Sequence, residues 1–252
     1  MDIFKGAVIG YKNRVKGSQS QDYIDYKFFD KCIICAVADG HSTSYFKYSD
    51  IGAKLACRVS IEVLEKYNDN LFKLESDLQN GLVQLEICEK WQEYVSKHYK
   101  SVNPIVRNTE YMKYSTTLIV ALISNDFRLY LKIGDGSVVE KTEGIYKNII
   151  ETNNKYIVDS IGREDSHENI LYHLKKNNNN EKTDWIILFT DGYENSFDTD
   201  EDLYNSLETT ISRYTKNIFS KTHLNTTYKS YLNKLSREKS QDDISIMFVG
   251  LK

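Results

Sequence analysis

The sequence predicts an α+β fold in which two β-sheets lie inside and helices pack outside. The expected elements run in the order strand, helices, several strands, two helices, strand, and they do not alternate one-for-one as a doubly wound sheet requires. The chain has 252 residues, which is ample for one large domain with a sizeable core. We therefore expect a single domain that spans residues 1–252.

The N-terminal part of the chain contains three short runs that predict strands. The first covers residues 6–11, and a polar stretch over residues 13–22 separates it from the run at residues 23–26. The run over residues 32–38 is almost continuously apolar and leads directly into Asp39. An apolar run of this length bounded by turn residues is typical of a buried strand.

Two amphipathic helical patterns follow. Ser49 or Asp50 is expected to cap the first helix, whose apolar residues recur at helical spacing as far as Leu64. The second pattern covers residues 71–95 and is long, so we expect it to break near Gly81. Both apolar stripes are assigned to core packing rather than to a partner groove.

The middle of the chain predicts a β-hairpin. Residues 116–123 and 127–133 form its strands, and the polar residues 124–126 form its turn. A shorter pair of strands is expected at residues 138–140 and 145–146.

The last third is polar at first and becomes regular near its end. Residues 147–183 are weakly patterned, and the Asn run at residues 177–180 predicts a flexible loop. A buried strand is expected at residues 185–189, two helices between residues 203 and 235, and a closing strand at residues 244–249.

Charge and hydropathy narrow the possible partners. A formal net charge of −3 gives no reason to expect nucleic acid. No apolar stretch approaches the roughly 20 residues of a membrane span, and the first residues lack the pattern of a secretion signal. We expect a monomer in the cytoplasm that binds neither membrane nor nucleic acid.

The four cysteines favour structural roles. Cys32 and Cys35 lie three positions apart on one expected strand and so point to opposite faces, which argues against a zinc or redox pair. Cys57 and Cys88 fall within helical patterns, where small core residues are expected.

Four short acidic motifs, each beside an apolar run, carry most of the functional information. They are Asp39-Gly40-His41, Gly134-Asp135-Gly136, Thr190-Asp191-Gly192 and Asp242-Asp243. A single Asp-Gly after a strand is a common turn. Four partly desolvated carboxylates close together would be costly if unpaired, and a divalent cation relieves that cost through oxygen ligands. The set therefore favours a divalent metal site.

Together with Gln21-Asp22 and Ser115-Thr116-Thr117, these motifs resemble, in order, those of the metal-dependent protein phosphatases of the 2C type (PPM family). The chain resembles a bacterial single-domain member. The resemblance implies a central β-sandwich of two antiparallel sheets flanked by helices on both sides, with a two-metal site at one end. It also implies a serine/threonine protein phosphatase that hydrolyses phosphomonoesters by a metal-bridging hydroxide, with a variable flap near residues 147–183.

The resemblance assigns metal ligands residue by residue. Asp39 would bridge two Mg²⁺ or Mn²⁺ ions, and the Gly40 carbonyl would be a further ligand. Asp191 and Asp242 would hold one ion. Asp135 matches a residue that, with Asp191, can hold a third and more loosely bound ion.

Besides Asp39, His41 is the residue expected to be catalytic. It matches the family residue proposed as general acid to the leaving oxygen, a role that suits an imidazole with a pKa of roughly 6.5. The alternative is that His41 only hydrogen-bonds a metal-bound water. Asp243 is expected to orient its neighbours.

The first motif departs from the family pattern. Many members carry Glu-Asp there, and the Glu binds the second metal, whereas this chain has Gln21-Asp22. Gln offers only a neutral carbonyl oxygen. Gln21 and Asp22 are both candidate ligands of the second ion. Asp22 could replace the missing Glu as a ligand, or it could hydrogen-bond a ligand without binding the ion itself.

The expected phosphate-binding cation is also displaced. The family often places an Arg four residues before that Glu, and this position is Gly17 here. Arg14 and Lys16 are the nearest cations and are the phosphate-binding candidates, Arg14 through a bidentate fork and Lys16 as a point charge. The alternative for each is an ordinary solvated loop charge.

Three functions are compatible with these residues. The first is an active phosphatase acting on phosphoserine or phosphothreonine of a phosphorylated protein substrate. The second is a pseudophosphatase that serves as a binding or regulatory module, which Gln21 and Gly17 support. The third is a phosphoesterase for a small molecule, since metals and hydroxide would serve it equally.

Overall fold

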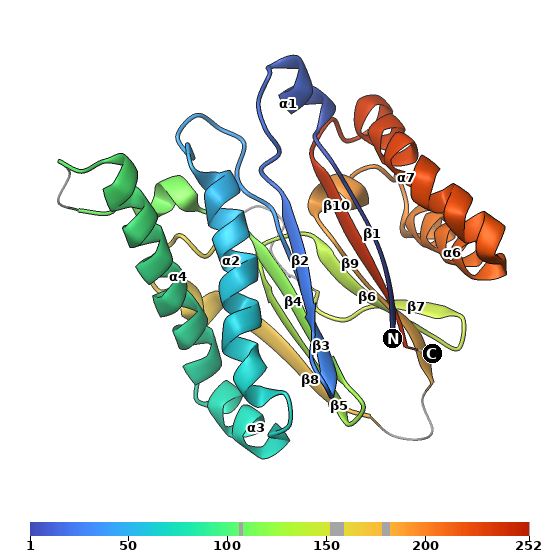
Figure 1. The fold of residues 1–252 in the computed structure, drawn as a ribbon, viewed down its shortest axis with the longest axis horizontal. Helices are drawn as coiled ribbons and strands as arrows, with labels where there is room; N and C mark the ends of the chain where they lie inside the picture. The colour runs from blue at the N-terminus through green and yellow to red at the C-terminus, as the bar shows by residue number, and fades with distance from the viewer. Residues whose placement is uncertain (106–107, 152–158, 178–181, 252) are drawn as a thin grey trace.

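Two five-stranded sheets face each other and helices cover their outer faces (Figure 1). The computed structural model describes residues 1–105, 108–151, 159–177 and 182–251. One sheet has the strand order β1-β10-β9-β6-β7 and the other β2-β3-β4-β5-β8. Neighbouring strands pair antiparallel throughout both sheets. The predicted α+β sandwich is confirmed.

The strands are β1 (Asp2–Val8), β2 (Tyr23–Phe28), β3 (Cys32–Ala38), β4 (Leu118–Ser124), β5 (Phe127–Ile133), β6 (Ser137–Thr142), β7 (Ile145–Asn148), β8 (Leu171–Lys176), β9 (Thr183–Phe189) and β10 (Ile244–Gly250). The α-helices are α1 (Tyr11–Val15), α2 (Ser49–Leu64), α3 (Leu71–Gln79), α4 (Leu82–Val102), α5 (Asp191–Glu194), α6 (Asp200–Lys216) and α7 (Ile218–Glu238). Within the described part of the chain, no helix is both long and apolar enough to cross a membrane.

The core consists of three apolar layers. The middle layer fills the space between the sheets, and one outer layer lies under α2 and α4 while the other lies under α6 and α7 (Figure 1). Alternate residues of β3 supply two layers, because successive side chains of a strand point to opposite faces. Cys35 lies in the middle layer and Cys32 in the layer under the helices, so the two thiols are on opposite faces as predicted.

Of two predicted helix boundaries, the break at Gly81 is confirmed and the N-cap of α2 is not. Gly81, in a left-handed conformation with φ +71°, separates α3 from α4, which confirms the predicted break. The predicted cap of α2 was wrong, because the helix already begins at Ser49. The position before it is Tyr48, whose side chain makes no capping bond in the described structure. The Ser49 hydroxyl instead donates to the carbonyl of His41 at 2.9 Å.

Two other segments differ from the sequence expectation. The stretch predicted as a first strand at residues 6–11 is divided between the end of β1 and the short helix α1. The weakly patterned segment 147–183 contributes the end of β7 and the whole of β8, an edge strand on β5. The side chains of β8 are largely exposed and do not alternate between apolar and polar, so the sequence pattern did not predict this strand. Residues 152–158 and 178–181 of this segment, with most of the Asn run, lie outside the described residues.

A buried ion pair joins the two sheets. Arg128 of β5 and Glu140 of β6 are each 3% exposed, and Nη1 of the arginine lies 3.3 Å from Oε1 of the glutamate. The hydroxyl of Tyr130 donates to the same glutamate oxygen at 2.5 Å. Buried charges require partners of this kind, so the pair fixes how β5 and β6 face each other.

Candidate metal centre

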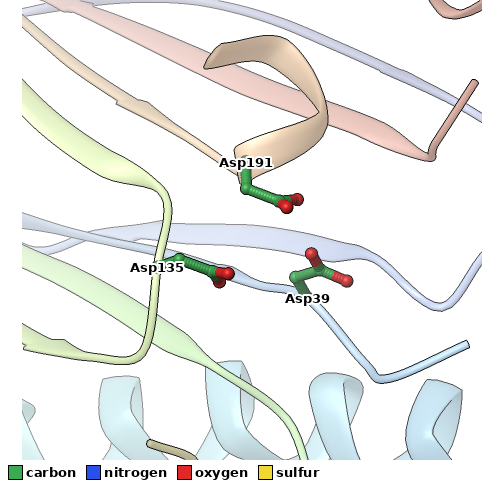
Figure 2. Close-up of side chains that lie close together, drawn as sticks. All are labelled: Asp39, Asp135 and Asp191. Atoms are coloured by element: carbon green, nitrogen blue, oxygen red, sulfur yellow. The ribbon is translucent and has the colours of Figure 1, made fainter. Parts of the chain in front are cut away.

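Three carboxylates from distant segments converge at one end of the sandwich. Asp39 follows β3, Asp135 lies in the turn between β5 and β6, and Asp191 is the first residue of α5 (Figure 2). One carboxylate oxygen of each residue lies within 4.8 Å of those of the other two. The structure thus brings together three of the aspartates that the sequence analysis selected.

Two threonines that directly precede β4, Thr116 and Thr117, hold the backbone of Asp39 by hydrogen bonds. The N–H of Thr117 and the hydroxyl of Thr116 both donate to the Asp39 carbonyl, each at 2.8 Å. The Asp39 N–H donates in return to the Thr117 hydroxyl at 3.2 Å. Gly40 forms an isolated β-bridge with Thr116, and a Cβ on Gly40 would lie 2.8 Å from the Ser49 backbone. The Ser115-Thr116-Thr117 motif therefore positions the end of β3.

Asp135 is held in a tight turn between two glycines. Gly134 and Gly136 have φ values of +91° and +74°, which L side chains rarely adopt. A Cβ on Gly134 would also lie 2.6 Å from the methyl group of Thr117. The turn therefore packs directly against the segment that clamps Asp39.

Asp191 is positioned by a backbone-to-backbone contact. The Thr190 N–H donates to the Ser245 carbonyl of β10 at 3.0 Å, which fixes the residue before Asp191. A Cβ on Gly192 would lie only 1.9 Å from the Asp243 carbonyl oxygen. Only glycine fits there, so the Thr-Asp-Gly sequence has a steric reason as well as a chemical one.

Asp22 approaches the same cluster, whereas the Gln21 side-chain oxygen is engaged elsewhere. The Thr190 hydroxyl donates to Oδ2 of Asp22 at 2.8 Å, and Asp22 lies close enough to Asp39 to interact with its carboxyl group. Oε1 of Gln21 accepts from the side-chain amide of Asn13 at 3.2 Å. Of the two candidates in the first motif, Asp22 is therefore the better placed.

Asp243 is buried at 3% exposure and ties the N-terminal segment to β10. Its carboxylate accepts hydrogen bonds from the backbone N–H groups of Gly10 and Gln21, the latter at 2.6 Å. Because both oxygens are used in this way, the structure fits the predicted orienting role.

Asp242 lies outside the group of three but within its electrostatic range. Its charge helps to raise the pKa of both Asp135 and Asp191. Burial raises the pKa of Asp242 itself, and the Lys12 ammonium opposes that rise. Lys12 of α1 was not predicted, because nothing in the polar stretch around it indicates proximity to Asp242.

The ionised form of each carboxyl group in the cluster is unfavourable in the metal-free protein. Burial, followed by neighbouring carboxylates, raises the pKa of Asp22 and of Asp39 well above the usual range. Burial raises the pKa of Asp191 to about 6. Burial also raises the pKa of Asp135, which the Lys132 ammonium partly offsets.

Two buried oxygens in the cluster have no hydrogen-bond partner among the described residues. They are Oδ1 of Asp22 and Oδ1 of Asp191. Buried polar atoms are nearly always paired, so these two require a further partner. A hard divalent cation fits an all-oxygen, negatively charged donor set of this kind, so the residues present suit Mg²⁺ or Mn²⁺.

We expect Mn²⁺ to stabilise the protein, because the ion would relieve carboxylate repulsion that the unfolded chain does not have. At 100 times the dissociation constant, binding at one site adds about 2.7 kcal/mol, or a rise in Tm of about 5–10 °C for a chain of this size. Thermal unfolding with and without Mn²⁺, against NaCl at matched ionic strength, measures this. An unchanged Tm at millimolar Mn²⁺ would contradict the assignment.

His41 follows Asp39 by two positions in the chain. Its half-buried ring packs against Phe46 at a centroid distance of 4.6 Å. Burial lowers the pKa of His41, and the Arg163 guanidinium lowers it further. The general-acid role of His41 stays a prediction.

The two predicted phosphate-binding cations lie at the surface. Arg14 of α1 donates to the Ile9 carbonyl at 3.4 Å, and Lys16 follows the same helix. Both side chains are exposed. Their phosphate-binding role stays a prediction.

A cavity of about 1070 Å³ opens beside the cluster. Asp135 and Asp191 line it together with Lys132, Glu194 and Asn195. Its lining is mixed polar and apolar, and it is large enough for a phosphorylated side chain and its flanking residues. Sequence patterns did not indicate this cavity, because its walls come from both sheets and from α6.

Comparison with known proteins gives a consistent picture. A family model described as protein phosphatase 2C matches residues 9–229. No curated protein matches the chain by sequence.

Three solved structures illustrate the shared fold. A bacterial serine phosphatase has a TM-score of 0.66 at 12% identity, covering 100% of this chain and 98% of that one. The serine/threonine phosphatase Stp1 from Staphylococcus aureus has a TM-score of 0.64 at 11% identity, covering 100% and 95%. The catalytic domain of the phosphatase PstP in complex with 2 manganese ions has a TM-score of 0.57 at 12% identity, covering 98% and 96%. At these identities the likeness establishes the fold.

Proposed function

The chain belongs to the protein phosphatase 2C family, and we propose that the centre around Asp39 is its catalytic site. The protein is a metal-dependent serine/threonine protein phosphatase. The convergence of Asp39, Asp135 and Asp191 within 4.8 Å carries the assignment of the site. The unpaired buried oxygens of Asp22 and Asp191 support it, because they match what a hard cation needs.

The proposed ligand set uses the chain's own carboxylates. Asp39 would be shared between two Mg²⁺ or Mn²⁺ ions, with Asp191 and Asp242 completing one ion and Asp22 serving the other. Asp135 would help Asp191 to hold a third ion. The chemistry that such an ion pair supplies when bound is activation of water near neutral pH and neutralisation of charge on the transferring phosphoryl group.

The protein itself supplies position and shielding. The threonine clamp on Asp39, the glycine turn at Asp135 and the steric contact at Gly192 hold the carboxylates before any substrate arrives. Such preorganisation lowers the barrier because little rearrangement is needed during the reaction. His41 would give a proton to the leaving seryl or threonyl oxygen.

The proposed substrate is a phosphorylated protein, presented to the centre through phosphoserine or phosphothreonine. The cavity beside Asp135 and Asp191 offers room for the residues next to the phosphorylated one. We further expect the enzyme to act as a monomer in the cytoplasm, without nucleic acid or membrane as partner.

Hydrolysis of p-nitrophenyl phosphate and of a phosphothreonine peptide tests the proposal. We expect turnover with Mn²⁺ or Mg²⁺, loss of turnover with EDTA, and recovery when Mn²⁺ is added in excess of the chelator. Calorimetry with Mn²⁺ is the companion measurement, because it separates metal binding from catalysis.

Two results would overturn this function. Folded protein that binds Mn²⁺ but turns over neither substrate would indicate a pseudophosphatase that serves as a binding module. A clear preference for nucleotides or other small phosphoesters over the phosphopeptide would indicate a small-molecule phosphoesterase.

A further inference from the structure

The segment that begins at residue 159 packs against the metal centre. The Ile161 N–H donates to the carbonyl of Thr116 at 3.0 Å, and the hydroxyls of Ser160 and Ser115 lie 2.5 Å apart. A Cβ on Gly162 would lie 2.9 Å from Ser115. Since Thr116 forms the bridge with Gly40, this segment is anchored to the strand pairing that positions the predicted metal ligands.

Arg163 follows directly after this anchor. Its guanidinium is held by one described partner, the carboxylate of Asp159, at 3.4 Å. The two side chains are 43% and 40% exposed, and an exposed ion pair four residues apart contributes little to stability. The remaining guanidinium donors are therefore available to a ligand.

The Asp159–Arg163 pair lies at the cavity beside the carboxylate cluster. Asp159 lines that cavity together with Asp135 and Asp191, and Nη1 of Arg163 lies 3.4 Å from Oδ1 of Asp159. Two other cations near the cluster, Lys132 and Lys12, interact with other groups. Lys132 is 3% exposed and donates to the Ile150 carbonyl at 3.3 Å, while the charge of Lys12 acts on Asp242.

We propose that Arg163 is a phosphate-binding residue of this enzyme, with its guanidinium fork on the non-bridging oxygens of a substrate phosphate bound in the cavity beside Asp135 and Asp191. The inference rests on the proposed function, because it assumes that phosphate binds at the Asp39 centre. A phosphate dianion offers bidentate acceptors and more charge than the Asp159 carboxylate, so it displaces that carboxylate from the guanidinium.

Phosphate binding is measured by titrating inorganic phosphate into Mn²⁺-loaded protein by calorimetry, alongside KM and kcat for p-nitrophenyl phosphate. For Arg163→Met we expect phosphate affinity to fall about 10-fold or more and KM to rise similarly, because charge-assisted hydrogen bonds are lost. Arg163→Lys should recover part of the affinity, since lysine keeps the charge without the fork. Asp159→Asn, which removes the competing carboxylate, should strengthen phosphate binding.

Matched variants make the outcome specific. Arg237→Met, an exposed arginine of α7 paired with Glu238, should leave all parameters unchanged. The affinity for Mn²⁺ should stay within about twofold in Arg163→Met, because arginine is no metal ligand.

The inference is overturned if Arg163→Met binds phosphate like the parent, or if only Arg14→Met or Lys16→Met weakens phosphate binding. Failure of the proposed function would show differently, as a parent protein that does not turn over at all. Retained Tm in the Arg163 variants confirms that folding is intact.

Discussion

Asp39→Asn is expected to lower the rate of phosphoester hydrolysis by more than about 100-fold. Loss of a group behind a metal ligand typically costs 10–100-fold, and Asp39 is the carboxylate proposed to touch both ions. The same change should make the metal-free protein more stable, because burial and the charges of Asp22, Asp191 and Asp135 all raise the pKa of Asp39. Steady-state kinetics with Mn²⁺ and urea unfolding in EDTA measure the two effects.

Opposite signs in activity and stability make this a strong test. If Asp39 had only a structural role, its replacement would lower both the activity and the free energy of unfolding. If Asp39 is a metal ligand, its replacement lowers the activity but raises the free energy of unfolding of the metal-free protein. Asp30→Asn, an exposed residue between β2 and β3, is the matched control and should change neither. Activity within a few-fold of the parent in Asp39→Asn would contradict the assignment of the site.

Glu140→Gln is expected to destabilise the fold by about 3–5 kcal/mol, the usual effect of removing one member of a buried ion pair. The change leaves the Arg128 guanidinium without its charged partner between the two sheets. Nε of Arg128 already has no hydrogen-bond partner among the described residues, so a weaker contact with residue 140 leaves this buried cation poorly compensated. Equilibrium urea unfolding measures the loss.

Two further variants separate charge burial from general damage. Glu65→Gln removes the exposed pair with Lys27 and should cost less than about 1 kcal/mol. The double variant Arg128→Met, Glu140→Leu removes both buried charges and should be markedly more stable than Glu140→Gln alone. If Glu140→Gln and Glu65→Gln destabilise equally, the buried pair does not have the proposed role.

Most strands could be predicted because their environment leaves a simple trace in the sequence. β3, β4 and β9 have both faces covered, so they appear as nearly continuous apolar runs. β8 is an edge strand whose side chains are largely exposed and do not alternate between apolar and polar, so no local pattern distinguishes it from a loop. β5 hides a different feature, because its polar positions Arg128 and Lys132 face inward rather than toward water.

Some residues of the candidate site could also be predicted from the sequence, whereas others could be recognised only in the structure. Asp39, Asp135 and Asp191 were identifiable because each follows or begins an element at a glycine-bearing turn, in the order of a known family. The preference for Asp22 over the Gln21 side-chain oxygen depends on the Thr190 hydroxyl and on Asn13, which approach from other elements. Arg163 lies in a segment without any pattern, so only its anchoring to Thr116 indicates a role.

The amino-acid sequence by itself determined the α+β sandwich, the family and the aspartates of the metal centre. These follow from local properties: apolar periodicity, turn chemistry and short motifs, which a single chain segment carries on its own. Only the tertiary structure decided the buried Arg128–Glu140 pair, the alignment of β8 and the packing of the segment before Arg163 against Thr116. Each of these depends on contacts between different helices, strands or loops, and such contacts exist only after these elements have packed together.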